Sequence, residues 1–263
     1  MTASVTIVIP TYNRAELLRK AIDTSIAQTY PCEIIVVNHG STDHTDQVAD
    51  SYGDRIRYIK SETDYGPHFC WLDGIIRATG DYVHLQFDDD WLEPAYIETL
   101  IALMQPDVGF AFSTVKVVNT ETGQEDYLFK SKRRLPNSGI FPVKNIEKYV
   151  LKRLISPAAA IYRKQDLIDA IYQGNLPLKN AHYHGVGPDA FATLLCLLRY
   201  PKFGYSQEPL ACFRDHANSI TTNARSDETK KQQLKAAYQD VKNFYKELKW
   251  LQRIRRMQQF FKK

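Results

Sequence analysis

Three consecutive aspartates, Asp88, Asp89 and Asp90, are the residues of this sequence whose type and spacing best suit chemistry. They follow an apolar run over 82–87 that is typical of a buried strand, and a helix is predicted to begin near Pro94. Adjacent carboxylates repel one another, so a compensating positive charge is expected. Mg²⁺ and Mn²⁺ prefer oxygen ligands of this kind, often together with substrate phosphates. The alternative is a solvated acidic turn that caps the following helix.

Strand-like apolar runs alternate with helical patterns in the first hundred residues, and these elements would position the aspartates. Strands are predicted over 5–9, 32–37, 57–59 and 82–87, and helices over 15–29, 45–52 and 71–78. This alternation predicts an α/β fold with a mostly parallel sheet. Ligands bind such sheets beyond the carboxyl ends of the strands, so the loops at 10–14, 38–43 and 88–90 are expected to converge there.

The composition is that of an ordinary globular protein. The chain has 263 residues, of which 44% are hydrophobic and 24% charged, and can bury a full core. Four separated cysteines without a CxxC pair indicate buried free thiols. The first residues lack the pattern of a signal peptide, and no apolar run approaches the roughly 20 residues of a membrane span. We therefore expect a cytoplasmic protein.

The C-terminal region differs from the rest in charge. Residues 230–263 carry 11 Lys or Arg and 2 Asp or Glu, which leaves residues 1–229 with a net charge of −5 out of the total of +4. Apolar residues recur there at helical spacing, so a basic amphipathic helix is predicted. Three roles remain open: binding the inner face of an anionic membrane, packing on the α/β domain, or contact with a second subunit. No RNA-recognition motif is present, and we expect no nucleic-acid partner.

Four segments, taken in order, carry a resemblance to a known family. They are IVIPTYNR at 7–14, IIVVNHGSTD at 34–43, SETDYG at 61–66, and ATGDY at 78–82 leading to the three aspartates. Neither the GxGxxG nor the GxxxxGK[ST] fingerprint occurs. The chain is similar, over about residues 4–220, to family-2 inverting glycosyltransferases with the GT-A fold, of the bacterial surface-polysaccharide type.

The resemblance implies a domain organisation. A catalytic domain would cover residues 1–222, with a nucleotide-binding half (1–105) and an acceptor half (106–222). Residues 223–263 would form the basic helical tail.

The resemblance also implies which residues bind a nucleotide sugar. The first nucleotide loop would contain Pro10, Thr11, Tyr12 and Arg14, with the tyrosine against the base. Asn38 and His39 stand where the family has an Asp-Asp pair, whose second Asp contacts the uracil edge. A carboxylate accepts a hydrogen bond from a pyrimidine N3–H, whereas a neutral histidine accepts through one ring nitrogen only, so the base that is read stays open. Asp64 either borders this pocket or forms the turn before Gly66.

The resemblance places the remaining contacts with the nucleotide sugar in the acidic turn and at the end of the domain. By the resemblance, Asp88 lies near the ribose, and Asp89 coordinates Mn²⁺ or Mg²⁺ on the diphosphate. Asp90 lies toward the sugar or supports the metal ligand. His216 would be the second metal ligand, and Arg214 would steady the diphosphate.

A second chemical centre is expected where Asp189 begins an apolar helix. The family places a Glu-Asp pair before this helix and uses it as the general base; here Pro188 replaces the Glu. The alternative is plain helix capping, because a carboxylate is stabilised at a helix N-terminus. His182 and His184, two residues apart, are expected on the surface or in an acceptor pocket.

These features favour a metal-dependent glycosyltransferase that moves a sugar from a UDP, dTDP or GDP sugar to a glycan or lipid-linked acceptor, in cell-surface polysaccharide synthesis. The protein would be cytoplasmic, with a peripheral position on the inner face of the membrane as one alternative. The departures at positions 39 and 188 leave a non-catalytic nucleotide-sugar-binding scaffold as the competing function. A nucleotidyltransferase is disfavoured, because residues 10–14 make a poor phosphate-binding loop.

Overall fold

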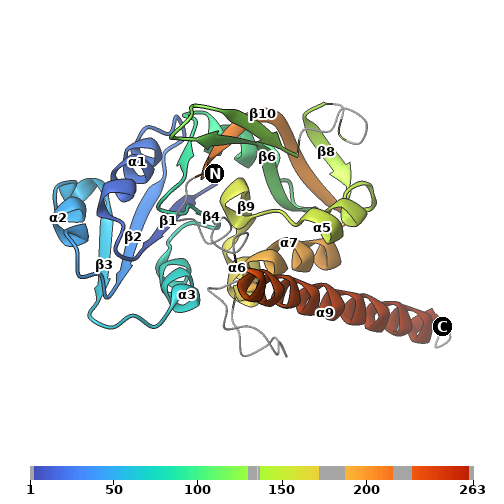
Figure 1. The fold of residues 1–263 in the computed structure, drawn as a ribbon. Coiled ribbons are helices and arrows are strands. Elements are labelled where there is room, and N and C mark those ends of the chain that lie inside the picture. The colour runs from blue at the N-terminus through green and yellow to red at the C-terminus, as the bar shows by residue number, and fades with distance from the viewer. Residues whose placement is uncertain (1–2, 130–134, 136, 172–186, 216–226, 261–263) are drawn as a thin grey trace.

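The computed structural model describes residues 3–129, 135, 137–171, 187–215 and 227–260. They form a curled mixed sheet flanked by helices, and a long C-terminal helix extends away from the sheet (Figure 1).

The first half alternates strands and helices as the sequence predicts. Its elements are β1 (Val5–Thr11), α1 (Ala15–Ile26), β2 (Glu33–His39), α2 (Thr45–Asp50), the 3-10 helix η1 (Gly53–Arg55), β3 (Arg57–Ser61), α3 (Pro67–Arg77) and β4 (Tyr82–Leu85). β1 is buried along its whole length, and so is β2 after its first residue. Continuous burial is typical of parallel strands that are covered on both faces. β1 pairs in parallel with both β2 and β4, so the carboxyl ends of all three strands share one edge.

The second half adds antiparallel pairing. Its elements are β5 (Trp91–Leu92), α4 (Tyr96–Ile101), β6 (Val108–Asn119), β7 (Glu125–Leu128), β8 (Gly139–Pro142), η2 (Val143–Asn145), α5 (Glu147–Arg153), η3 (Pro157–Ala159), β9 (Ala160–Arg163), α6 (Lys164–Ile171), α7 (Pro188–Arg199), β10 (Lys202–Asp215) and α9 (Glu228–Phe260). The sheet order is β3-β2-β1-β4-β9-β6-β10-β5, with β7 on β6 and β8 on β10. β9 runs antiparallel to both β4 and β6 and joins the two halves. The predicted α/β fold is confirmed. Its sheet is mixed: the strands of the first half pair in parallel, as predicted, and most pairings of the second half are antiparallel.

Aromatic side chains fill the core of the second half. The Phe110 ring stacks on Phe112, Tyr162 and Phe203, each with ring centroids 5.9 Å apart. All four residues are fully buried. Such stacking adds to the energy gained by burying these rings.

Two helix starts differ from the predicted ones. α3 begins at Pro67, four residues before the predicted start, because proline is favoured in the first turn of a helix. α4 begins at Tyr96, because the preceding Trp91 and Leu92 pair with β10 as a short strand. The residue before α4 is Ala95, which makes no side-chain capping bond. The three aspartates are therefore not a helix cap.

The C-terminal helix α9 packs on the domain through its first part. Ala237, Val241 and Tyr245 are buried, and the rings of Phe244 and Phe191 of α7 lie 5.5 Å apart. The Tyr245 hydroxyl donates to Glu147 of α5 at 2.9 Å. Of the three alternatives for the tail, domain packing is the one that this part of the helix shows. Within the described residues, no helix has the length and apolar character needed to cross a bilayer.

Candidate active site

The acidic turn at the carboxyl end of β4 is held by residues that follow β1. Arg14 Nη1 donates to Asp88 Oδ1 at 3.0 Å and to Asp89 Oδ2 at 2.9 Å. The Thr11 hydroxyl donates to Asp88 Oδ2 at 2.9 Å. Burial raises the pKa of Asp88 to about 6, although Arg14 opposes the rise. The loops at 10–14 and 88–90 therefore meet at one edge of the sheet.

The far end of the chain reaches the same turn. β10 pairs with β5, and this pairing brings Arg214 beside the aspartates. The backbone N–H of Arg214 donates to Asp90 Oδ1 at 3.0 Å, and its Nε donates to the Asp89 carbonyl at 3.1 Å. Burial and the neighbouring Asp89 raise the pKa of Asp90 well above its usual value. Asp90 is thus costly to ionise without a further positive charge.

Asn38 holds the loop at 38–43 in shape. Its amide nitrogen donates to Asp46 at 3.0 Å and to the Tyr58 hydroxyl at 2.8 Å, and its oxygen accepts from the Ser41 N–H at 3.1 Å. All polar atoms of the Asn38 side chain are engaged within the protein. Any effect of Asn38 on a bound nucleotide acts through the loop that it orders.

His39 faces a different environment. Its side chain is almost fully buried; Nε2 lies 3.6 Å from an Asp73 carboxylate oxygen, and Nδ1 has no hydrogen-bond partner among the described residues. The Tyr65 ring meets the imidazole edge-on at 6.1 Å, and Phe69 lies beside Tyr65. Tyr65 and Phe69 are both exposed. This corner therefore combines one unsatisfied ring nitrogen with flat apolar surface.

Two further predicted nucleotide residues flank this corner. Tyr12 is 49% exposed, as a ring that stacks on a ligand would be. Asp64 accepts the Gly66 N–H at 2.7 Å, which is the turn-forming contact given as the alternative for this residue. Gly40 packs so closely on the Asp64 backbone that an added Cβ would lie 2.8 Å from its nitrogen. Asp64 thus borders the 38–43 loop as well as forming its own turn.

Asp189 lies in the first turn of α7, after Gly187 and Pro188. Its carboxylate accepts the Gly187 N–H at 2.8 Å, so local capping is observed. Tyr238 of α9 lies near this carboxylate and opposes part of the rise in its pKa. Burial nevertheless raises the pKa of Asp189 to about 6. α7 packs on η3, and η3 packs on β4, which connects this helix to the strand that ends in the acidic turn.

Comparison with known proteins assigns the family. A sequence profile described as "Glycosyl transferase family 2" matches residues 6–170, which is more than half of the chain. The chain belongs to this family. The match includes the acidic turn and both loops that face it, so the predicted resemblance is confirmed.

Individual relatives differ in how much of the chain they match. A protein of Streptococcus pneumoniae named "Glycosyltransferase GlyA" is 39% identical over 100 residues, covering 36% of this chain and 14% of that protein. The chain thus spans a small part of that relative. Among solved structures, residues 1–349 of S. aureus TarS in complex with UDP-GlcNAc superpose with a TM-score of 0.63 at 20% identity, over 82% of this chain and 60% of that solved chain.

A second solved structure carries a metal. The mannosyltransferase PcManGT from Pyrobaculum calidifontis, in complex with GDP-Man and Mn²⁺, superposes with a TM-score of 0.58 at 17% identity. The superposition covers 86% of this chain and 61% of PcManGT. At such identities both structures establish the shared fold, which confirms the GT-A architecture.

The ligand set for a metal is incomplete within the described residues. No group of three or more His, Cys, Asp or Glu side chains converges there as a metal site would require. Of the two predicted ligands, Asp89 is on the acidic turn and His216 lies outside the described residues, as do His182 and His184. The raised pKa values of Asp88 and Asp90 show a demand for positive charge. The carboxylate oxygens and the negative charge of the acidic turn suit a divalent cation.

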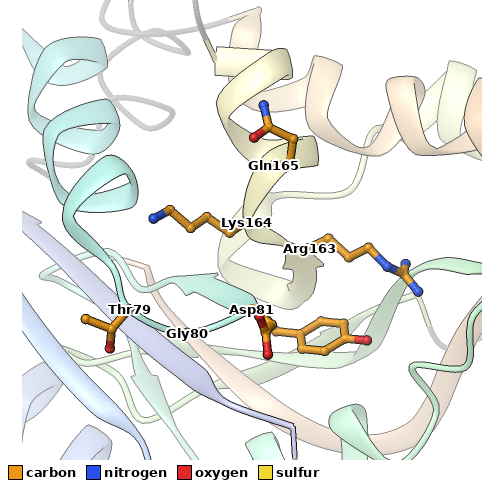
Figure 2. A pocket seen from close by; sticks show the side chains of 7 residues that line it. Thr79, Gly80, Asp81, Arg163, Lys164 and Gln165 are labelled. Carbon is orange, nitrogen blue, oxygen red and sulfur yellow. The ribbon is translucent and has the colours of Figure 1, made fainter.

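A pocket occurs at the other end of β4 and is unrelated to this site. It is lined by Thr79, Gly80, Asp81, Tyr82, Arg163, Lys164 and Gln165 (Figure 2). Lys164 Nζ donates to the carbonyls of Ile76 and Ala78 at the end of α3, and Arg163 donates to the Val108 carbonyl. Its two basic side chains therefore serve the fold by binding backbone carbonyls.

Sequence reasoning missed several residues of the site. Asp73 lies beside His39, and Tyr65 and Phe69 form the exposed aromatic corner. The sequence predicts the start of α3 at residue 71. Tyr65 and Phe69 therefore fall in the preceding loop, where no helical face points to a shared role. Tyr238 was predicted only as an apolar position of the tail, because its contact with Asp189 spans 49 residues of sequence.

Proposed function

We propose that this protein transfers a sugar from a nucleotide-diphosphate sugar to a hydroxyl group of a glycan or lipid-linked acceptor. The observation that carries the proposal is the acidic turn at the carboxyl end of β4, bridged to Arg14 and Arg214, in a chain of glycosyl transferase family 2. We assign residues 1–222 to the transferase domain, with donor contacts in 1–105 and acceptor contacts in 106–222.

The donor lies along the carboxyl edge of the sheet. Tyr12 stacks on the base, His39 contacts the base edge, and Asp88 contacts the ribose. Arg14 and Arg214 steady the diphosphate, since guanidinium groups pair well with phosphate oxygens. TarS and PcManGT were solved with UDP-GlcNAc and GDP-Man, which supports a UDP or GDP sugar as the donor class.

The transfer step is a single displacement. Asp189 removes the proton from the acceptor hydroxyl, whose oxygen forms a bond to the anomeric carbon while the bond to the diphosphate breaks. The configuration of that carbon inverts, because no covalent intermediate forms. A carboxyl group with a pKa of about 6 is ionised near neutral pH and is well matched to this task.

A divalent cation, Mn²⁺ or Mg²⁺, completes the site. Asp89 and His216 would hold it, with Asp90 beside them. When bound, the cation neutralises the charge that grows on the diphosphate leaving group. The Mn²⁺ in the PcManGT complex supports this assignment.

A thermal-shift screen of UDP, GDP, CDP and dTDP sugars, with and without Mn²⁺, tests the proposal. A ligand that binds the native state raises its midpoint by mass action, so at least one donor is expected to raise it, and to raise it further with Mn²⁺. D88N/D89N is the matched variant that should lose this response. If no donor changes the midpoint under either condition, the proposed function is wrong.

A further inference from the structure

The helix α3 holds Asp73 beside the carboxyl end of β2. α3 packs on β1 and β2, and an added Cβ at Gly74 would lie 2.4 Å from Val8 Cγ1 and 2.8 Å from Val37 Cγ2. The absence of a side chain at this glycine lets the helix lie close against both strands. Asp73, the residue before it, is therefore fixed in place against His39, the last residue of β2.

One carboxylate oxygen of Asp73 is available to a ligand. Oδ1 accepts a hydrogen bond from Arg77 Nε at 2.7 Å. Oδ2 lies 3.6 Å from His39 Nε2, which is longer than a hydrogen bond, and it accepts none within the described residues. The Asp73 side chain is 30% exposed, so a ligand at this corner can reach the carboxylate.

Flat aromatic surface is presented at the same corner. Thr11 of β1 pairs with Asn38 of β2, so the residues that follow, Tyr12 and His39, leave adjacent strands at the same level. Tyr12 is exposed, and so is Tyr65, whose ring meets that of His39 edge-on at 6.1 Å. Nucleobases stack on such rings and carry hydrogen-bonding groups along their edges. The corner therefore offers stacking surface together with one open acceptor oxygen.

We propose that Asp73 determines which base is bound, by accepting a hydrogen bond from the N3–H of uracil or thymine. This inference rests on the proposed function, in which the base lies at His39, and it narrows the donor to a UDP or dTDP sugar. Cytosine has a lone pair at N3, and an ionised carboxylate can only accept hydrogen bonds. Guanine presents two donors, N1–H and its amino group, but Arg77 already occupies the second oxygen that they would need.

UDP and CDP are matched probes for this contact, because they differ only at the N3 and C4 edge of the base. Isothermal titration with Mn²⁺ present measures the ratio of their dissociation constants. We expect UDP to bind the unaltered protein about tenfold more tightly, since a hydrogen bond to a charged acceptor is made by UDP alone. In D73N the amide can also donate to cytosine N3, so the ratio should fall to about one. The substitution is isosteric at a partly exposed site, so the fold is retained.

R77M is the control, because Asp73 also forms an i,i+4 ion pair with Arg77. This variant removes the ion pair and keeps the carboxylate, so UDP should keep its preference over CDP. The inference is overturned if D73N retains the ratio of the unaltered protein, or if R77M loses it as D73N does. It is also overturned if the unaltered protein binds CDP as tightly as UDP, or GDP more tightly than UDP. If none of UDP, dTDP, GDP and CDP binds, the proposed function itself is wrong.

Discussion

At the scale of single residues, His39 is the main departure from the family pattern. The resemblance expects a carboxylate at this position, but the structure has an imidazole. Its Nε2 lies near Asp73, and its buried Nδ1 has no hydrogen-bond partner in the part of the chain that the structure describes. The resemblance places this position at the edge of the base. The exposed Tyr65 and Phe69 offer apolar surface on the same side. The identity of the base should therefore depend on His39.

Replacing His39 with alanine should flatten the preference among nucleotides. The favoured nucleoside diphosphate is expected to lose about tenfold in affinity, the equivalent of one hydrogen bond of about 1.4 kcal/mol, while the others change less. Isothermal titration with UDP, GDP, CDP and dTDP measures the ranking.

The control for this substitution is H44A. His44 is exposed and bonds to Glu16, away from the Tyr65 corner. An equal loss across all four nucleotides in H39A, or the same change in H44A, would show that His39 does not read the base.

At the scale of elements, α9 has two different apolar faces. Val241 faces the domain and is fully buried. Trp250 follows it by nine residues, which is two and a half helical turns, so it lies on the opposite side. Met257 continues this outer stripe, and Trp250 and Met257 are 61% and 55% exposed. Residues 248–263 contain six Lys or Arg and no Asp or Glu. We propose that this outer stripe binds an anionic membrane surface that carries the acceptor.

The double substitution W250S/M257S should weaken binding to liposomes that contain phosphatidylglycerol. Both side chains are outside the α7 contact, so turnover of the donor in solution should be unchanged. Co-sedimentation with anionic and with neutral liposomes measures the effect. Deleting the whole tail would be a poor test, because it also removes the packing of α9 on α7.

I76S provides the comparison, since Ile76 is a similarly exposed apolar residue on α3. If W250S/M257S and I76S bind anionic liposomes equally well, the outer stripe is not a membrane contact. Contact with a second subunit would then be the remaining alternative, which sedimentation velocity can detect.

At the scale of the whole molecule, the sequence predicted what depends on local patterns. The parallel strands, the acidic turn and the start of α7 next to Asp189 follow from apolar runs and turn residues that lie close together in the chain. The insertion of β9 between β4 and β6 and the seating of α9 on α7 depend on contacts between distant segments. Sequence periodicity does not report contacts between distant segments. The packing of α9 on α7 and the pairing of β5 with β10 could therefore not be predicted.

The central claim is that the acidic turn binds a nucleotide-sugar donor and that Asp189 activates the acceptor. Turnover of the identified donor by D189N, compared with D81N at the opposite end of β4, tests it most directly. We predict that D189N loses about 10²–10⁴-fold in kcat while its thermal shift with the donor is retained, and that D81N is unaffected. Turnover by D189N equal to that of the unaltered protein would contradict the account.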